Sequence, residues 1–452
     1  MTRRFALSGR SNRPAISFES ELNAEQMTVV TAPGGAMLVV AGAGSGKTRA
    51  LTYRLAWLVE QGVDPQRLLL VTFTNRAARD MLRRTEQILQ CDPGTIWAGT
   101  FHHIANRLLR RYGHHIGIQR DFTILDREDA KDLMRAAVAD LELDTTERRF
   151  PRKNVLVAIS SFVQNTLETL DEVLAKRYPQ FADDADKIRQ VLDMYARKKG
   201  SAQLLDFDDL LSGWLLLLQE HEETRRELAE RFEHILVDEY QDTNAVQGEI
   251  VDLMAERHNN ICVVGDDSQS IYSFRGATVE NIMGFQQRHG DTAVYRLETN
   301  YRSTPEILAL ANDSIARNTA RLPKELRAVR RGGRMKPAFV PCNDMYSQSR
   351  FIAEYVLHLL EQDRRMADIA VLYRSHWHSM EIQLELQRRN IPFQVRGGLR
   401  FFEQAHIKDL LAYLRLVFNP FDELAWLRLL PHLPRIGDTY ARRIWQHISA
   451  TP

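Results

Sequence analysis

The feature that most constrains this chain is a glycine-rich turn between a predicted strand and a predicted helix. The apolar run 36–40 precedes the turn, and a helical pattern at residues 49–58 follows it. Closely spaced glycines let backbone N–H groups close around phosphate oxygens, and the start of the helix adds its positive end. A lysine and a threonine at the end of the turn suit a phosphate and its metal ion. The pattern predicts a phosphate-binding loop formed by Ala41, Gly42, Ala43, Gly44, Ser45, Gly46, Lys47 and Thr48, although Ala41 stands where the general pattern has glycine.

A second predicted strand, at residues 235–237, ends in two acids. It runs into Asp238 and Glu239, about 190 residues after the phosphate loop. In α/β sheets the carboxyl ends of the strands hold the ligand, so both acids are expected beside the phosphates. Asp238 suits a Mg²⁺ ligand together with Thr48, and Glu239 suits a base that orients and deprotonates an attacking water. The two patterns together predict Mg²⁺-dependent hydrolysis of a nucleoside triphosphate.

Composition argues against membrane and disulfide-rich classes. The longest apolar stretch, residues 210–218, is far shorter than the roughly 18 residues of a membrane helix, so no membrane span is expected. Cys91, Cys262 and Cys342 are isolated and lack metal-ligand spacing. Such cysteines fit a reducing compartment, and we expect a cytoplasmic protein.

Overall charge does not indicate nucleic acid, because 60 basic and 59 acidic residues give a net charge of +1. Two segments are locally basic. Residues 1–17 hold four arginines and no acid, which favours a disordered arm over a transit peptide. Residues 317–336 hold eight Lys or Arg residues against Glu325 alone. That stretch is equally compatible with phosphate contacts and with a solvated loop.

Apolar runs typical of strands alternate with helical segments, which predicts an α/β fold with parallel sheets. Between about residues 103 and 202 the pattern is helical, so an α-helical insertion is expected. Alternation resumes near Ala293 and continues to residues 394–396, which predicts a second α/β domain. The expected strands lie at residues 36–40, 68–73, 235–237, 261–264, 338–340 and 369–373.

Eight segments occur in the order of the motifs of one protein family. They are residues 22–26, the phosphate loop with Arg49, and residues 72–79, 99–102, 205–210, 237–243, 264–276 and 300–303. Together they resemble the ordered motifs of the UvrD/Rep-like superfamily 1A DNA helicases. The resemblance covers residues 22–303 and continues more weakly to the end of the chain.

This resemblance implies roles for further residues around ATP. Gln26 would read the adenine edge, since an amide both donates and accepts. Arg49 and Tyr301 would sandwich the purine ring. Gln269 would sense the γ-phosphate and link it to the DNA surface. Arg302 would act as an arginine finger offered across a closing cleft, so that the catalytic set becomes Lys47, Asp238, Glu239, Gln269 and Arg302.

The same resemblance implies a surface for single-stranded DNA. Its stacking residues would be Phe73, Phe207, Tyr272 and Phe274, because base stacking tolerates any sequence. Phe274 departs from the tryptophan common at its position, and a packing role for each ring stays open. The backbone contacts would come from Asn75, His102 and Arg275.

The family pattern also implies a domain order. We expect a disordered arm at 1–17, a first RecA-like domain at 18–102 and 203–278, a helical insertion at 103–202, an incomplete second RecA-like domain at 279–418 and the start of a second insertion at 419–452. The family's later motifs, an H-x-x-K-G-like segment and a final arginine motif, do not occur in the sequence. A chain that stops before its motor is complete is therefore expected.

Two functions follow from this sequence. The first is an ATP-dependent translocase and helicase of 3′ to 5′ polarity, acting on single-stranded DNA and junctions in repair or replication, together with proteins of those processes. The alternative is a nucleotide-gated module that binds single-stranded DNA or a partner and hydrolyses ATP weakly. The presence of Lys47, Asp238 and Glu239 favours the first function, and the lack of the later motifs in this sequence favours the second.

Overall fold

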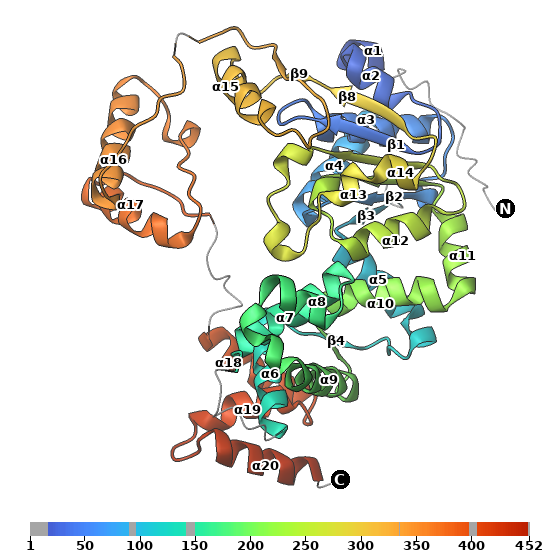
Figure 1. The fold of residues 1–452 in the computed structure, drawn as a ribbon, viewed down its shortest axis with the longest axis vertical. Helices are drawn as coiled ribbons and strands as arrows, with labels where there is room; N and C mark the ends of the chain where they lie inside the picture. Colours follow the sequence, from blue (N-terminus) through green and yellow to red (C-terminus); the bar gives the residue numbers. More distant parts are fainter. Residues whose placement is uncertain (1–16, 90–95, 142–149, 334, 397–404, 451–452) are drawn as a thin grey trace, which may run out of the picture. The chain divides into compact units, whose positions relative to one another are not determined.

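The computed structural model describes residues 17–89, 96–141, 150–333, 335–396 and 405–450 (Figure 1). It divides into two compact units, Met1–Lys336 and Pro337–Pro452. The basic arm predicted at residues 1–17 lies, except for Ser17, outside the described residues.

The first unit is built on a six-stranded sheet in which every neighbouring pair of strands is parallel. The strand order is β3-β2-β6-β7-β1-β8. The strands are β1 (Met37–Ala41), β2 (Leu68–Val71), β3 (Trp97–Gly99), β6 (His234–Val237), β7 (Ile261–Gly265) and β8 (Ala293–Leu297). This parallel α/β sheet with a phosphate loop is the fold that the sequence predicts.

Helices cover both faces of this sheet, which explains why its strands are apolar throughout. Leu38 and Val40 of β1 point into one core, whereas Met37 and Val39 point into the other. One core is closed by α2 (Ala24–Val30), α3 (Lys47–Glu60) and α4 (Asn75–Leu89), and α1 (Phe18–Glu21) packs on α3. The opposite core is closed by α5 (Phe101–Tyr112), α10 (Phe207–Glu220), α11 (Glu222–Arg231), α12 (Ala245–Ala255), α13 (Glu280–Met283) and α14 (Phe285–Arg288).

A helical insertion separates β3 from β6. Its two ends are brought together by a short parallel pair, β4 (Thr123–Ile124) and β5 (Leu204–Leu205). Between them run α6 (Arg127–Asp140), α7 (Lys153–Thr166), α8 (Leu170–Arg177) and α9 (Ala185–Ser201). Near the end of α9, Lys199 is buried between Asp206 and Asp209, which cap the start of α10. The insertion is thereby fastened to α10 of the sheet domain.

The strand near Ala293 belongs to the first sheet. Sequence analysis began a second α/β domain at residue 279 and counted this strand in it, but β8 pairs along its whole length with β1. The reason is that the apolar edge of β1 needs a hydrogen-bonded neighbour, and β8 supplies it. Beyond β8, β9 (Thr299–Asn300) pairs with β10 (Arg327–Ala328), and α15 (Pro305–Ala316) lies between them in sequence.

The second unit is helical in its described part. Its helices are α16 (Met345–Glu361), α17 (His376–Arg388), α18 (Ala405–Phe418), α19 (Glu423–Leu429) and α20 (Asp438–Ala450). Ala353 and Val356 of α16 pack on Ile382 and Leu386 of α17.

The strands expected at residues 338–340, 369–373 and 394–396 are not assigned in the described residues of this unit. A strand exists only through a ladder with a neighbour, and here no neighbour within the described range pairs with them. Phe339 is 91% exposed and Leu372 is 93% exposed as a result. Within the described part of residues 279–418, the strand ladder beyond β8 is therefore limited to the short parallel pair of β9 and β10. In the same described part of the chain, no helix is both long and apolar enough to cross a bilayer.

Candidate nucleotide and DNA site

The carboxyl ends of four neighbouring strands, β6, β7, β1 and β8, carry most of the predicted site. The phosphate loop follows β1, the acids Asp238 and Glu239 follow β6, and the loop with Gln269 follows β7. The segment with Arg302 follows β8. The sheet order thus gathers groups that lie up to about 260 residues apart in sequence at one edge, where α/β folds hold their ligands.

The phosphate loop depends on glycine for its shape. Gly44 and Gly46 have φ values of +78° and +88°, a region that side chains other than glycine rarely adopt. A Cβ on Gly46 would also collide with the amide nitrogen of Gln26. That amide donates to Ser45 O at 3.2 Å, and Ser45 Oγ donates to Gly42 O at 2.8 Å. Gln26 therefore holds the loop, and its expected contact with adenine stays a prediction.

Lys47 and Glu239 meet across the loop. The Lys47 ammonium lies 2.7 Å from Glu239 Oε2, and the lysine side chain is 9% exposed. Glu239 has φ 52° and ψ 46°, a left-handed conformation that costs a non-glycine residue about 1–3 kcal/mol. Strain of this kind persists where the surroundings impose it, and here it falls on the residue that is predicted to act as the base. A nucleotide phosphate that binds Lys47 must compete with this carboxylate.

The acids beside Glu239 are crowded together, and burial disfavours their charged forms. Burial, with the charge of Glu239, raises the pKa of Asp238 to about 7, although Lys47 acts in the opposite direction. Burial and Glu239 also raise the pKa of Asp242 to about 6. Asp242 Oδ1 is buried with no hydrogen-bond partner among the described residues. Crowded carboxylates with an unsatisfied oxygen gain from a nearby cation.

These residues fit a Mg²⁺ ion whose ligands come from both the protein and a phosphate. Within the described ranges, no three His, Cys, Asp or Glu side chains are grouped as a metal site. Mg²⁺ usually takes one or two carboxylates and completes its shell with phosphates and water. Asp238, with Thr48 beside Lys47 in the first turn of α3, is consistent with that preference.

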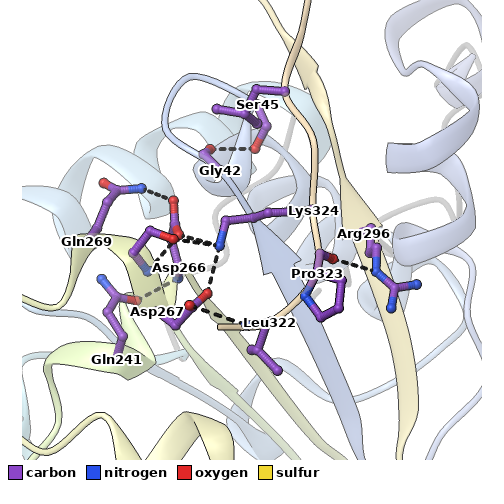
Figure 2. A network of polar contacts seen from close by, with 12 residues as sticks. Gly42, Ser45, Gln241, Asp266, Asp267, Gln269, Arg296, Leu322, Pro323 and Lys324 are labelled. Carbon is purple, nitrogen blue, oxygen red and sulfur yellow. Dashed lines mark hydrogen bonds and ion pairs between the residues drawn. The ribbon is translucent and has the colours of Figure 1, made fainter. Parts of the chain in front are cut away.

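The loop after β7 contains a network of buried polar contacts that sequence reasoning did not find (Figure 2). Gln269 Nε2 donates to Asp266 Oδ2 at 2.6 Å, and Asp266 N donates to Gln241 Oε1 at 2.9 Å. Gln241 Nε2 in turn donates to Glu239 Oε2 at 2.9 Å. The predicted sensor Gln269 is therefore joined to the predicted base Glu239 by hydrogen bonds through Asp266 and Gln241.

The end of β9 and the residues that follow it lie against the phosphate loop. Asn300 Nδ2 donates to Ala43 O at 2.5 Å, and Tyr301 N donates to Gly44 O at 3.0 Å. A Cβ on Gly44 would lie 2.6 Å from Arg302 Cβ. Arg302 was expected from a second domain, but it lies in the same compact unit as the phosphate loop. Asn300 was missed, since an asparagine in sequence carries no signal for a contact 257 residues away.

Arg49 and Tyr301 border the segment between α1 and α2. Arg49 donates to Glu21 Oε2 at 2.6 Å, and the Tyr301 hydroxyl accepts from Asn23 Nδ2 at 2.7 Å. The Arg49 guanidinium also lies 4.9 Å from the ring centre of Tyr53. Both residues are partly exposed, and their sandwich around a purine stays a prediction.

Three of the predicted stacking residues form one aromatic surface. Phe73 follows β2 and lies 4.9 Å, between ring centroids, from Tyr272, which lies 5.9 Å from Phe274. Arg275 lies over both Tyr272 and Phe274. Phe73 and Phe274 are 41% and 53% exposed. Exposed rings with an arginine beside them suit nucleic-acid bases and phosphates.

The fourth predicted stacking residue, Phe207, lies next to His102. Phe207 is 50% exposed and lies 5.8 Å from His102, measured between ring centroids. Burial lowers the pKa of His102 to about 4, so its ring is uncharged at neutral pH. A phosphate contact by His102 would then be a neutral hydrogen bond. Asn75, also predicted to contact DNA, is exposed at the start of α4.

Unpredicted hydrogen bonds connect the start of α10 to the loop that carries Asp238, Glu239 and Asp242, here called the acid loop. Asn165 of α7 donates to Asp208 Oδ1 at 2.7 Å and accepts from Asn244 Nδ2 at 2.6 Å. Asp208 follows Phe207, and Asn244 follows the acid loop and caps α12. Through the side chain of Asn165, the helical insertion therefore contacts both the motif predicted to face DNA and the motif predicted to face the nucleotide.

Comparison with known proteins gives two matching family models and several curated relatives. The model described as "UvrD/REP helicase N-terminal domain" matches residues 22–290, and "UvrD-like helicase C-terminal domain" matches residues 295–450. The chain is 39% identical over 423 residues to the ATP-dependent DNA helicase PcrA of Bacillus subtilis, covering 92% of this chain and 56% of the relative. It is 37% identical over 429 residues to PcrA of Leuconostoc citreum, covering 94% and 56%. PcrA of Staphylococcus epidermidis is 36% identical over 419 residues, covering 92% and 56%. The chain thus spans about half the length of the curated relatives it matches.

Proposed function

Because the chain belongs to the UvrD/Rep helicase family, we propose that it is the ATP-hydrolysing core of a single-stranded-DNA translocase and helicase. The observation that carries the proposal is the pairing of Lys47 with Glu239 at 2.7 Å at the sheet edge that also bears Asp238 and Gln269. The 3′ to 5′ polarity, the preference for junctions and a role in repair or replication are extensions from the family resemblance.

In the proposed hydrolysis, Glu239 acts as the base. A nucleotide phosphate takes the Lys47 ammonium, which frees the Glu239 carboxylate to accept a proton from water. The water oxygen then forms a bond to the γ-phosphorus, and the bond from that phosphorus to the β-γ bridging oxygen breaks. ADP and inorganic phosphate leave, and the proton passes from Glu239 to solvent.

Thr48 and Asp238 would hold Mg²⁺ beside the phosphates. When bound, the ion would neutralise part of the negative charge that the phosphates bring. The raised pKa of Asp238 is consistent with this role, because a cation next to a buried carboxyl restores its charged form. Asp242, whose Oδ1 has no partner in the described part of the chain, would accept a hydrogen bond from the hydration shell.

Arg302 and Gln269 would respond to the γ-phosphate from two sides. Arg302 belongs to the segment that hydrogen-bonds the phosphate loop, and Gln269 is linked to Glu239 through Asp266 and Gln241. The Gln269 loop leads within three residues to Tyr272 of the aromatic surface. Nucleotide turnover is proposed to alter the grip of Phe73, Tyr272 and Phe274 on the bases.

The test is steady-state ATP hydrolysis with and without single-stranded DNA, over a series of salt concentrations. The variant is Glu239→Gln, which removes the base and the competitor of the phosphate for Lys47. The matched control is Glu233→Gln, since Glu233 lies just before β6, at the opposite end of that strand, and pairs with Arg67. DNA affinity should fall as salt rises, because phosphate contacts release counterions.

Strong stimulation of hydrolysis by DNA, lost in Glu239→Gln and kept in Glu233→Gln, is the expected result. Glu239→Gln should lose hydrolysis about 10²-fold or more while still binding ATP. If ATP and DNA bind but DNA does not stimulate hydrolysis in the unaltered chain, the motor proposal fails and a nucleotide-gated binding module takes its place.

A further inference from the structure

We propose that Lys324 is a positioning residue that holds Gln269 in place to read the terminal phosphate of the nucleotide. The inference rests on the proposed function, because Gln269 can act only if a nucleotide binds at the phosphate loop. Lys324 lies in the basic stretch 317–336, for which sequence left open phosphate contacts or a solvated loop. Its side chain does neither, because it is 5% exposed and lies among acidic partners.

The Lys324 ammonium contacts three consecutive residues of one loop. It donates to Asp267 Oδ1 at 2.6 Å and to Ser268 Oγ at 3.1 Å, and it forms an ion pair with Asp266 Oδ1 at 2.8 Å. The two carboxylate side chains are 4% and 2% exposed. Two carboxylates that are buried side by side repel each other and are poorly solvated, and the ammonium beside them offsets both costs.

Asp266 connects this ammonium to Gln269. One carboxylate oxygen of Asp266 faces Lys324, and the other accepts the Gln269 side-chain amide at 2.6 Å. Figure 2 shows Lys324 reaching the loop from one side while Gln241 and Gln269 lie on the other. Without the ammonium, the Asp266 carboxylate loses the ion pair that fixes its position and is free to turn toward water. That turn removes a charge-assisted hydrogen bond that orients the Gln269 amide.

The segment that carries Lys324 is itself anchored. Arg296 of β8 donates to Pro323 O at 2.9 Å, and Glu325 N donates to Glu298 Oε1 at 2.9 Å. A few residues later β10 pairs with β9, which directly precedes Tyr301 and Arg302. Lys324 therefore ties the Gln269 loop to the segment of Arg302, so that the two groups expected at the γ-phosphate share one support.

The experiment measures how strongly the full chain prefers a γ-phosphate. Calorimetric titrations give the dissociation constants of Mg²⁺–ADP and of Mg²⁺ with the non-hydrolysed ATP analogue AMP-PNP, and their ratio is the preference. The variants are Lys324→Met, Gln269→Ala and the two combined. Lys176→Met is the matched control, because Lys176 is an exposed lysine in the insertion, paired with Glu168. ATP hydrolysis is measured in parallel.

The expected result is that Lys324→Met and Gln269→Ala each lower the preference by roughly 10- to 100-fold, the range of one hydrogen bond to a charged group. The combined variant should lose no more than Gln269→Ala alone, since both act through one amide. Lys176→Met should keep the preference of the unaltered chain.

A purely structural role for Lys324 is separated by a charge-balanced variant. Lys324→Met with Asp267→Asn keeps the local net charge and should fold even if Lys324→Met does not. It still lacks the ammonium on Asp266, so the preference should stay low. Restored preference in this variant, unchanged preference in folded Lys324→Met, or multiplied losses in the combined variant would each overturn the inference.

The two proposals fail in distinguishable ways. If the unaltered chain binds both nucleotides with the expected ratios but does not hydrolyse ATP, the proposed motor function fails and the role of Lys324 stands. If the unaltered chain shows no preference for AMP-PNP over ADP, Gln269 reads no terminal phosphate, and the inference about Lys324 is overturned.

Discussion

Replacing Lys199 with methionine should destabilise the chain at the start of α10. Lys199 Nζ lies 2.7 Å from Asp206 Oδ2 and 2.6 Å from Asp209 Oδ2, with 6% of its side chain exposed. Asp206 and Asp209 form the capping box of α10, the helix that begins at Phe207. Loss of one partner from a buried ion pair leaves an uncompensated charge and costs about 3–5 kcal/mol.

The loss of stability in Lys199→Met should depend on pH. The direction of this dependence follows from the pKa values of the buried carboxyl groups. Burial, with the charge of Asp206, already raises the pKa of Asp209 to about 6 although Lys199 opposes the rise. Without Lys199 the pKa of Asp209 rises further above its unfolded value of about 3.9. A raised carboxyl pKa penalises folding above the folded pKa, and the penalty fades as pH falls toward the unfolded pKa. The variant should therefore differ most from the unaltered chain at pH 8 and less at pH 5.

Thermal unfolding followed by circular dichroism at both pH values measures the effect. At about 2 °C per kcal/mol, the midpoint of Lys199→Met should fall by roughly 6–10 °C at pH 8. Lys176→Met makes the same substitution at an exposed ion pair with Glu168 and should leave the midpoint nearly unchanged. A Lys199→Met shift no larger than that of the control, or an equal shift at pH 8 and pH 5, would refute the reasoning.

Two further predictions concern the loop and the sheet. Gly46→Ala and Gly62→Ala both place a side chain at positive φ, +88° and +92°, and each should cost about 1 kcal/mol of stability. Only Gly46→Ala should also weaken ATP binding in a titration, because its Cβ would displace Gln26. Gly62→Ala is the control, since no atom lies within 4 Å of the Cβ that it adds. Burial lowers the pKa of His234 to about 4, so the stability it contributes is present above its unfolded pKa of about 6.5 and lost as pH falls from there toward 4. Unfolding midpoints measured from pH 7 to pH 4 should fall less steeply for His234→Gln than for the unaltered chain, and parallel curves would contradict this assignment.

The sequence by itself determined the elements whose cause is local. The strand before Ala41 and the turn to Lys47 follow from an apolar run, closely spaced glycines and a helix start, all within about a dozen residues. The acids after β6 were predictable for the same reason, and the ordered motifs around them identified the family. The unbroken apolar run of β1 fits its burial on both faces of the sheet, which the structure shows.

Only the tertiary structure decided the contacts that join distant segments. β8 looked like the first strand of a new domain, yet it completes the first sheet because β1 offers it a free edge. Lys324 looked like any other member of a basic stretch, yet burial against Asp266 and Asp267 makes it an ion-pair partner. The burial of a charged side chain and the identity of its partner depend on where the fold places it. Strand order sets the pairing of groups that lie 57 residues apart, such as Lys324 and Asp267. Local pattern carries no information about that order until the sheet is assembled.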